Sequence, residues 1–386
     1  MKLLWSVVIV AFGVAAIAAL SSPLTAVAPQ TATSRIVASA NAFLSTLDAK
    51  QRRSVLYSFE DEKQRATWSN FPTSFVPRGG ISLKDMTPAQ RNAAMALVAS
   101  ALSPKGFEKV QEIMEADEVL KTNDAGRPPG PPPDSGNPAN RDRSGPPGPP
   151  LGNGAGRPPR GGPPNGGGAM FGKDLYYISI LGKPSEIDPW LFQFGGHHLA
   201  LNITIDGERG ILTPSLTGAQ PALYPSNGKT VRPLAGESDK GLALLNSLDD
   251  AQRKQAILSY QLADLVLGPG QDGKTIQPEG LKGSEMTEKQ RAMLLDVISE
   301  WVDIVHESAA AARMAQLKED INETWFAWSG PTTAEPGKNI KAYYRIQGPH
   351  LVIEYAPQTL GGDPSLHVHT MYRDPTNDYG RGIIGK

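Results

Sequence analysis

Hydrophobic and polar positions follow two different periods along the chain. Leu47, Val55, Leu56 and Phe59 recur at helical spacing within "FLSTLDAKQRRSVLYSF" (43–59). Thr87-Pro88 and Thr287-Glu288 are typical of the N-cap and first residue of further helices. By contrast, residues 190–205 and 342–357 alternate and are rich in β-branched and aromatic side chains, which predicts half-buried antiparallel strands. The pattern therefore predicts an α+β fold.

The same pattern occurs twice. "FLSTLDAKQRRSVLYSF" (43–59) matches "LLNSLDDAQRKQAILSY" (244–260), and "MTPAQRNAAMALVASAL" (86–102) matches "MTEKQRAMLLDVISEWV" (286–302). The two matches keep nearly the same offset, which chance resemblance between helices would not do. The strand-like segments 190–205 and 342–357 can be aligned as well. We therefore predict two fused copies of a helical-pair plus antiparallel-strand unit, forming one pseudo-twofold body.

One segment of the chain has a composition unlike the rest. The sequence has 40 glycines and 34 prolines, many of them within residues 123–170. Almost nothing there can be buried to offset the entropy of ordering, so we predict a disordered Pro/Gly-rich insertion. The first α+β half would then comprise residues 35–122 and 171–235, and the second half residues 236–386.

The N-terminus has the order of a secretory signal peptide. Lys2 precedes an apolar run from Leu3 to Leu20, and small residues follow at Ala26-Val27-Ala28. Residues 1–28 are thus predicted to export the protein to the periplasm or the extracellular space. An uncleaved membrane anchor is the alternative, because the run is about as long as the shortest spanning helices. A membrane is expected as a partner only in that case.

Charge and cysteine content exclude several classes of function. A net charge of −1 gives no electrostatic reason to expect binding to nucleic acid. The chain has no cysteine, so a metal would have to be held by His, Asp, Glu or neutral oxygen and nitrogen groups. Nucleophile elbows and phosphate-binding glycine loops are missing from the sequence. A small-molecule or peptide substrate of unknown identity remains.

Histidines carry the strongest chemical signal. Five of the six lie in three short segments, at positions 197, 198, 350, 367 and 369. Strand alternation would separate His197 from His198, and would place His367 and His369 on one face with Met371 and Arg373. Two imidazoles at that spacing, about 6 to 7 Å apart at Cα, can reach one ion.

The sequence does not decide which residue would be the third metal ligand. The candidates are His197 or His198, Glu354 and Asp374. Three nitrogen ligands would suit zinc or copper, and two histidines with a carboxylate would suit iron. Arg373 either orients an anionic substrate or forms a structural ion pair with Asp374. We take Glu354, Arg373 and Asp374 as candidate catalytic residues, and His197, His198, His367 and His369 as candidate metal ligands.

Each of these candidate residues also has a purely structural explanation. His197 would be a hydrogen-bonded core histidine, and His367 and His369 would belong to an edge strand that tolerates them. The loop "RATWSNFPTSFVPRGG" (65–80) would either line a ligand cleft or cap the open end of a helical layer.

Several motifs together resemble a known family. They are "LYYISILGKPSEIDPWLFQFGGHHLALNITI", "YYRIQGPHLVIEYAPQ", "HVHTMYRDPTNDYG" and "RATWSNFP". In these the chain is similar to the exported, largely bacterial family catalogued as domain of unknown function 3500. The resemblance extends from about residue 40 to 380 and implies a family but no activity.

Two hypotheses remain. The first is an exported metal-dependent enzyme, hydrolytic or oxidative, with a His-bound zinc, copper or iron. The second is a non-catalytic exported binding or scaffold protein whose histidines are structural.

Overall fold

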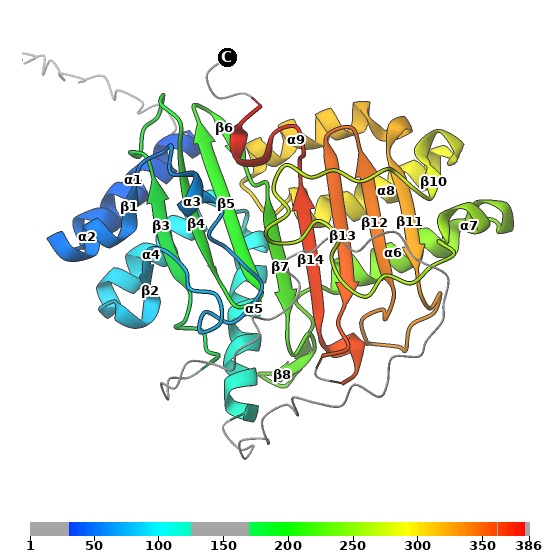
Figure 1. Cartoon of the computed structure of the whole chain (residues 1–386), viewed down its shortest axis with the longest axis horizontal. Helices are drawn as coiled ribbons and strands as arrows, with labels where there is room; N and C mark the ends of the chain where they lie inside the picture. The colour runs from blue at the N-terminus through cyan, green and yellow to red at the C-terminus, as the bar shows by residue number, and fades with distance from the viewer. Residues whose placement is uncertain (1–30, 125–169, 361, 383–386) are drawn as a thin grey trace, which may run out of the picture. The chain divides into compact units, whose positions relative to one another are not determined.

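The computed structural model describes residues 31–124, 170–360 and 362–382. The predicted signal segment 1–28 and nearly all of the predicted insertion 123–170 lie outside these residues. The described part is a mixed α+β structure (Figure 1). Within it, no helix is long and apolar enough to cross a membrane.

Helices occur in two groups along the chain. The first group is α1 (Ala32–Ser45), α2 (Ala49–Val55), α3 (Glu62–Arg65), α4 (Pro88–Ala101) and α5 (Pro104–Asp124). The second group is α6 (Ala235–Ser247), α7 (Asp250–Ala256), α8 (Glu288–Val302) and α9 (Glu307–Glu319). Thr87 and Thr287 are N-caps with capping boxes to Gln90 and Gln290, which confirms the two predicted helix starts.

The stretch 43–59, whose apolar residues recur at helical spacing, belongs to two helices and the start of a strand. Helix α1 ends at Ser45, and Asp48 caps a new helix by accepting hydrogen bonds from the backbone N–H groups of Lys50 and Gln51. The repeated Leu-Asp-x-x-Gln motif is therefore a capping box, because Asp249 and Gln252 do the same at the start of α7. Leu56 already belongs to a strand.

Most strands form one sheet of twelve. They are β1 (Leu56–Tyr57), β2 (Ile81–Ser82), β3 (Tyr177–Leu181), β4 (Trp190–Gly196), β5 (Leu199–Asp206), β6 (Arg209–Ile211), β7 (Ser215–Ala219), β10 (Leu281–Lys282), β11 (Trp325–Ser329), β12 (Tyr343–Gly348), β13 (Leu351–Pro357) and β14 (Val368–Arg373). Their order along the main path is β1-β3-β4-β5-β7-β14-β13-β12-β11-β10. Strands β8 (Tyr224–Ser226) and β9 (Lys229–Val231) form a separate hairpin. The central pair is β7 and β14, which run antiparallel.

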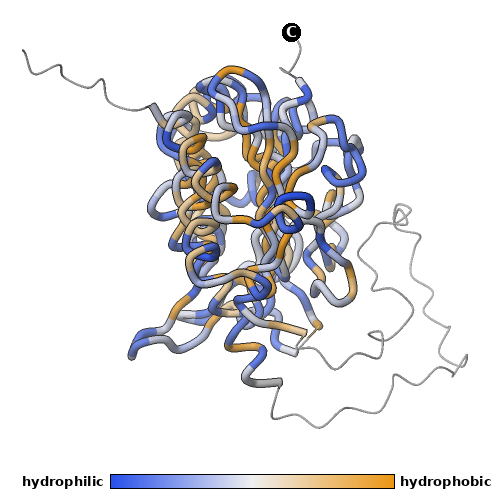
Figure 2. The backbone as a smooth tube through the Cα atoms, turned by 90° about the vertical axis from the view of Figure 1, so that its left-hand side faces the viewer, coloured by the Kyte–Doolittle hydropathy of each residue, from blue (hydrophilic) through white to orange (hydrophobic). Residues whose placement is uncertain are grey.

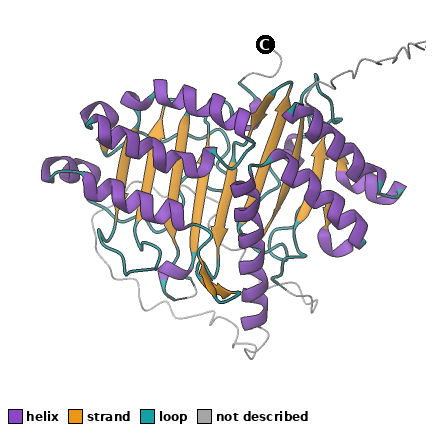
Figure 3. Ribbon diagram, turned by 180° about the vertical axis from the view of Figure 1, so that it is seen from behind, coloured by secondary structure: helices purple, strands orange, loops and turns teal. Residues whose placement is uncertain are grey.

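The two faces of the sheet have different covers. The longer helices pack on one face, as Figures 1 and 3 show from opposite sides. Between those helices and the sheet lies the main hydrophobic core, visible as the orange band in Figure 2. The opposite face is crossed by two long segments, which we call the first covering loop (residues 58–80) and the second covering loop (residues 258–280).

The strands were correctly predicted as antiparallel but not as half-buried. Strand β5 is buried at every residue except Asp206, and β14 is buried throughout. Polar side chains on the second face are covered by the two loops and hydrogen-bonded there; an example is Asn202, which is fully buried and donates to the carbonyl oxygen of Pro214. This loop-covered face carries the site.

Candidate metal centre

His367 and His369 come from the start of β14. His367 directly precedes the strand and His369 lies within it, and their Nε2 atoms are 3.1 Å apart. Met371 packs against Trp68 of the first covering loop, and Arg373 bonds to the second covering loop. The predicted shared face of these four residues is therefore confirmed, and it is the face that the loops cover.

Alternation had suggested that His197 and His198 lie within a strand, but they do not. They form the two-residue turn between β4 and β5. His198 has a positive φ of 61°, a left-handed conformation that costs energy for a residue other than glycine. The sequence gives no sign of this turn, because neither turn position is Gly, Asn or Asp. In this conformation the imidazole of His198 reaches the loop-covered face.

Strand register brings His198 and His369 together across β7. Leu199 pairs with Thr217, so the preceding residue His198 falls beside Gly218, and Gly218 pairs with His369 on its other side. A Cβ atom at Gly218 would lie 3.4 Å from His198 Cβ, 3.4 Å from His369 Cδ2 and 2.8 Å from the carbonyl oxygen of Val368. The missing side chain at this position therefore lets two imidazoles meet over the middle strand.

Gly218→Val is accordingly expected to separate the imidazoles. Its added methyl groups need the space that the two rings occupy, and overpacking of this kind costs about 1–3 kcal/mol. We expect metal affinity to fall at least tenfold, measured by chelator competition on protein that keeps its circular dichroism. Unchanged affinity would mean that the rings do not need the gap at Gly218.

Three imidazoles converge on one point. His367 Nε2 lies 3.0 Å from His198 Nε2 and 3.1 Å from His369 Nε2, and one nitrogen from each ring lies within 4.8 Å of the others. Nitrogen ligands of a tetrahedral ion at the usual bond length are about 3.3 Å apart. The three side chains, which we call the His triad (His198, His367 and His369), are 3%, 4% and 5% exposed. This spacing suits a metal ion.

The protonation of His367 also suits a metal. Its Nδ1 lies 2.7 Å from the carbonyl oxygen of Leu360, which can only accept, so Nδ1 carries the proton and Nε2 offers a lone pair. Burial lowers the pKa of His367 to about 3, and the neighbouring His369 adds to the shift. Burial and the adjacent imidazoles likewise place the pKa of His198 well below its usual value. Neutral imidazole is the form that binds metals.

His197 stands beside the His triad and not in it. Its Nδ1 lies 2.7 Å from Asp117 Oδ1 on α5, and its ring centroid is 3.6 Å from that of His198. Phe171 contacts the ring of His197 at 4.9 Å. His197 therefore supports the turn that presents His198. The remaining histidine of the three segments, His350 in the β12–β13 turn, contacts Asp320 instead.

Glu354 and Arg373 both bind the second covering loop. Glu354 accepts hydrogen bonds from the backbone N–H groups of Val266 and Leu267, at 2.7 and 2.8 Å, and from the Tyr343 hydroxyl. Burial raises the pKa of Glu354, and these hydrogen bonds oppose the shift. Arg373 donates to the carbonyl oxygens of Leu267 and Gly268 at 2.7 and 3.0 Å. Both side chains are thus bonded to protein.

The suggested ion pair between Arg373 and Asp374 was wrong. Among the described residues Arg373 pairs with Asp272 and Asp378, whereas Asp374 pairs with Arg313 at 2.9 Å. Adjacent strand residues point to opposite faces, so the two could not easily meet. A direct role of Glu354, Arg373 or Asp374 on a substrate stays a prediction.

Three residues at the site were missed from the sequence. Gly218 is one, and the others are Asn70 and Asp264 from the two covering loops. Asp264 Oδ1 and Asn70 Nδ2 lie 3.4 and 3.5 Å from His369 Nδ1. Asn70 also accepts the backbone N–H of His198 through its carbonyl oxygen. No motif marks Asp264. Asn70 lies within the segment 65–80 that the sequence offered as a possible cleft lining, but only the folded loops bring either residue to the histidines.

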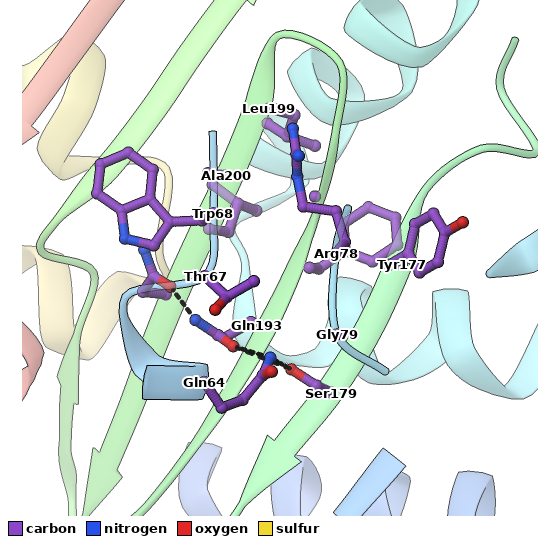
Figure 4. Close-up of a pocket in the computed structure, with 14 residues that line it drawn as sticks. Gln64, Thr67, Trp68, Arg78, Gly79, Tyr177, Ser179, Gln193, Leu199 and Ala200 are labelled. Carbon is purple, nitrogen blue, oxygen red and sulfur yellow. Dashed lines mark hydrogen bonds between the residues drawn. The ribbon is translucent and has the colours of Figure 1, made fainter. Parts of the chain in front are cut away.

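A small pocket under the first covering loop is lined in part by Leu199, the residue after His198 (Figure 4). Its amides bond to one another: Gln64 donates to Gln193 at 2.9 Å and to Ser179 at 3.2 Å, and Gln193 donates to the carbonyl oxygen of Arg65. Trp68 stands at its edge and packs on Ala200. The segment 65–80 therefore covers the sheet and fixes Asn70 in place, and it does not cap the helical layer.

A protein-family model matches most of the chain. The family model described as "Protein of unknown function (DUF3500)" matches residues 29–381. No curated protein and no solved structure matches the chain. The matched region includes the His triad, both covering loops and all strands of the sheet. The chain therefore belongs to the DUF3500 family.

Proposed function

We propose that the protein is an exported metal-dependent enzyme whose metal ion is held by His198, His367 and His369. The observation that carries the proposal is the convergence of three buried imidazole nitrogens within 4.8 Å of one another, with His367 Nε2 at 3.0 and 3.1 Å from the other two. Without an ion, these neighbouring nitrogens either face one another with lone pairs, which repel, or share protons in hydrogen bonds. A bound cation removes that conflict.

The donor set favours zinc or copper. All three converging donors are imidazole nitrogens, and the nearby carboxylates are used elsewhere: Asp264 faces the Nδ1 side of His369, and Glu354 binds the second covering loop. The two-histidine, one-carboxylate set typical of iron oxygenases is therefore a poorer fit. A zinc ion would supply an activated water for hydrolysis, and a copper ion would supply oxidative chemistry.

Access limits the substrate. Each histidine of the triad is at most 5% exposed, so a substrate would reach the metal only after a covering loop moves. The proposal of export rests on residues 1–28, which have the charged, apolar and small-residue parts of a signal peptide in the usual order. Such a segment supports a periplasmic or extracellular location.

The same burial favours a second candidate function. A closed three-histidine site completed by a fourth ligand would be structural, and the protein would then be a non-catalytic exported binding protein. The Co²⁺ derivative separates the two candidates, because a catalytic site keeps an exchangeable position. We expect azide to change the visible spectrum of the enzyme, whereas the spectrum of a closed site would stay constant.

We also propose that the chain arose by duplication. Gln90 bonds Gln51 at 2.8 Å between the capping boxes of α4 and α2, and Gln290 bonds Gln252 at 2.8 Å between those of α8 and α7. The sheet order, read outward from the central pair β7 and β14, gives β5-β4-β3 on one side and β13-β12-β11 on the other. Both observations support two related halves.

Elemental analysis tests the metal. The mature protein is expected to carry about one equivalent of zinc or copper, and a His367→Ala/His369→Ala variant with unchanged circular dichroism is expected to carry none. His350→Ala is the matched control, because this half-exposed histidine lies in a turn outside the triad and should leave the metal content unchanged. Protein that takes up no metal, even after reconstitution, would contradict the proposal.

A further inference from the structure

We propose that Asp264 is a positioning residue that fixes the tautomer of His369 able to bind the metal. This inference rests on the proposed function above and goes beyond it, because it concerns a residue of the second covering loop that does not touch the metal position. Carboxylates that accept the outer N–H of a metal-bound histidine are a common feature of such sites.

Asp264 is itself held in place. Its Oδ1 accepts a hydrogen bond from the backbone N–H of Leu265 at 2.7 Å and another from Gln358 Nε2 at 2.9 Å. The same oxygen lies 3.4 Å from His369 Nδ1. Because Gln358 follows β13 directly and β13 pairs with β14, the carboxylate is fixed relative to the strand that carries His369.

Asn70 and Asp264 make opposite demands on the same ring nitrogen. A carboxylate oxygen can only accept, so contact with Asp264 requires the proton on Nδ1 and leaves a lone pair on Nε2. The Asn70 amide nitrogen, 3.5 Å away, can only donate, which would leave the proton on Nε2 and block the metal position. The charge-assisted bond is the stronger of the two. Without a metal, the lone pair of His367 Nε2, 3.1 Å from His369 Nε2, also favours a proton on Nε2. Asp264 is therefore the contact of these three that favours the metal-binding tautomer.

Glu354 and Arg373 explain why the loop stays over His369. Glu354 accepts hydrogen bonds from the backbone N–H groups of residues 266 and 267, and Arg373 donates to the carbonyl oxygens of residues 267 and 268. The segment just after Asp264 is therefore fixed through both its N–H and its carbonyl groups. Both anchors rise from the sheet face that carries His369. In this arrangement two candidate catalytic residues position a third residue, Asp264.

The test compares Asp264→Ala, Asp264→Asn and Asp264→Glu with Asn70→Ala. Zinc affinity is measured by chelator competition, and the tautomer of His369 by nitrogen NMR of the metal-free protein. We expect Asp264→Ala and Asp264→Asn to weaken zinc binding about 10- to 100-fold and to move the His369 proton toward Nε2. Asp264→Glu should recover part of the affinity, and Asn70→Ala should keep the Nδ1–H form.

The outcomes are separable. Unchanged affinity together with an unchanged His369 tautomer in Asp264→Asn would overturn the role of Asp264, and this variant keeps the size of the side chain if the alanine variant folds poorly. Wild-type protein that binds no zinc or copper would overturn the proposed function instead. The NMR comparison of metal-free proteins would still decide whether Asp264 sets the tautomer.

Discussion

Arg373→Met is expected to lower the free energy of unfolding by about 3–5 kcal/mol, because it leaves the buried carboxylate of Asp378 without its cation. Arg373 is 1% exposed and pairs with Asp378 at 2.8 Å and Asp272 at 2.9 Å. Its loss also removes two hydrogen bonds to carbonyl oxygens of the second covering loop. Urea unfolding monitored by circular dichroism measures the change.

The loss should depend on pH. Burial raises the pKa of Asp378 to about 6, and the Arg373 guanidinium opposes that shift. A folded-state pKa above the unfolded value of about 3.9 means that stability falls as pH rises from about 4 to about 6. Without the guanidinium the pKa of Asp378 rises further. The variant should therefore be weakest at pH 8 and recover part of its stability at pH 5, where Asp378 takes up a proton.

Arg209→Met is the matched control for this prediction. Arg209 pairs with Asp206 at 2.7 Å, but its side chain is 60% exposed, so its removal should cost less than about 1 kcal/mol. Equal losses for the two arginine variants would show that Arg373 does not hold the second covering loop. Such a result would also weaken the argument that the loop positions Asp264.

Two of the helix caps could be predicted from local signals in the sequence. The pairs at Thr87 and Thr287 gave the right helix starts, since a capping box depends only on residues three apart. The Asp48 box was not recognised, because the apolar spacing around it fits a helix without any interruption. Here the polar N-cap decided the structure and the hydrophobic period did not.

The site was predictable only in part. Alternation correctly placed His367 and His369 on one face, since two positions on a strand need no other segment to be known. Their meeting with His198 depends on the register of β5 against β7 and of β7 against β14, and on the gap at Gly218. None of these follows from a local pattern.

The burial of the second sheet face was not predictable, for a different reason. A half-buried strand would leave the polar residues of this face in water, yet Asn202, Glu354 and Arg373 are each buried and bonded to protein there. Composition could not reveal this, because a polar position looks the same whether water or a loop satisfies it. Loops of this length that pack on a sheet are often functional, which agrees with the site found beneath them.

Lys109→Met is the second substitution expected to cost about 3–5 kcal/mol of unfolding free energy, because it leaves Glu237 buried without a cation. Lys109 on α5 bonds Glu237 on α6 and the carbonyl oxygen of Glu300 on α8, and all three side chains are less than 10% exposed. This cluster joins helices from the two proposed halves. Burial raises the pKa of Glu237, and Lys109 opposes the shift.

A double variant separates the charge from the packing. In Lys109→Met/Glu237→Met both partners are apolar and of similar length, so most of the lost stability should return. Urea unfolding at pH 7 of the two single variants and the double variant gives the coupling between the pair. If the double variant is no more stable than Lys109→Met, the loss comes from packing against α6 and not from an unpaired carboxylate.

Glu300 in the same cluster should make the wild-type protein sensitive to acid. Although burial alone raises the pKa of Glu300, the ammonium groups of Lys240, Lys105 and Lys109 together lower it to about 2. A folded-state pKa below the unfolded value of about 4.3 gives stability that is present above that value and is lost as pH falls toward 2. We expect about 2 kcal/mol from this group after allowing for solvent screening near exposed Lys105. Glu300→Gln should therefore flatten the stability profile between pH 5 and pH 2, and a variant profile with the wild-type slope would show that other carboxylates govern the acid response.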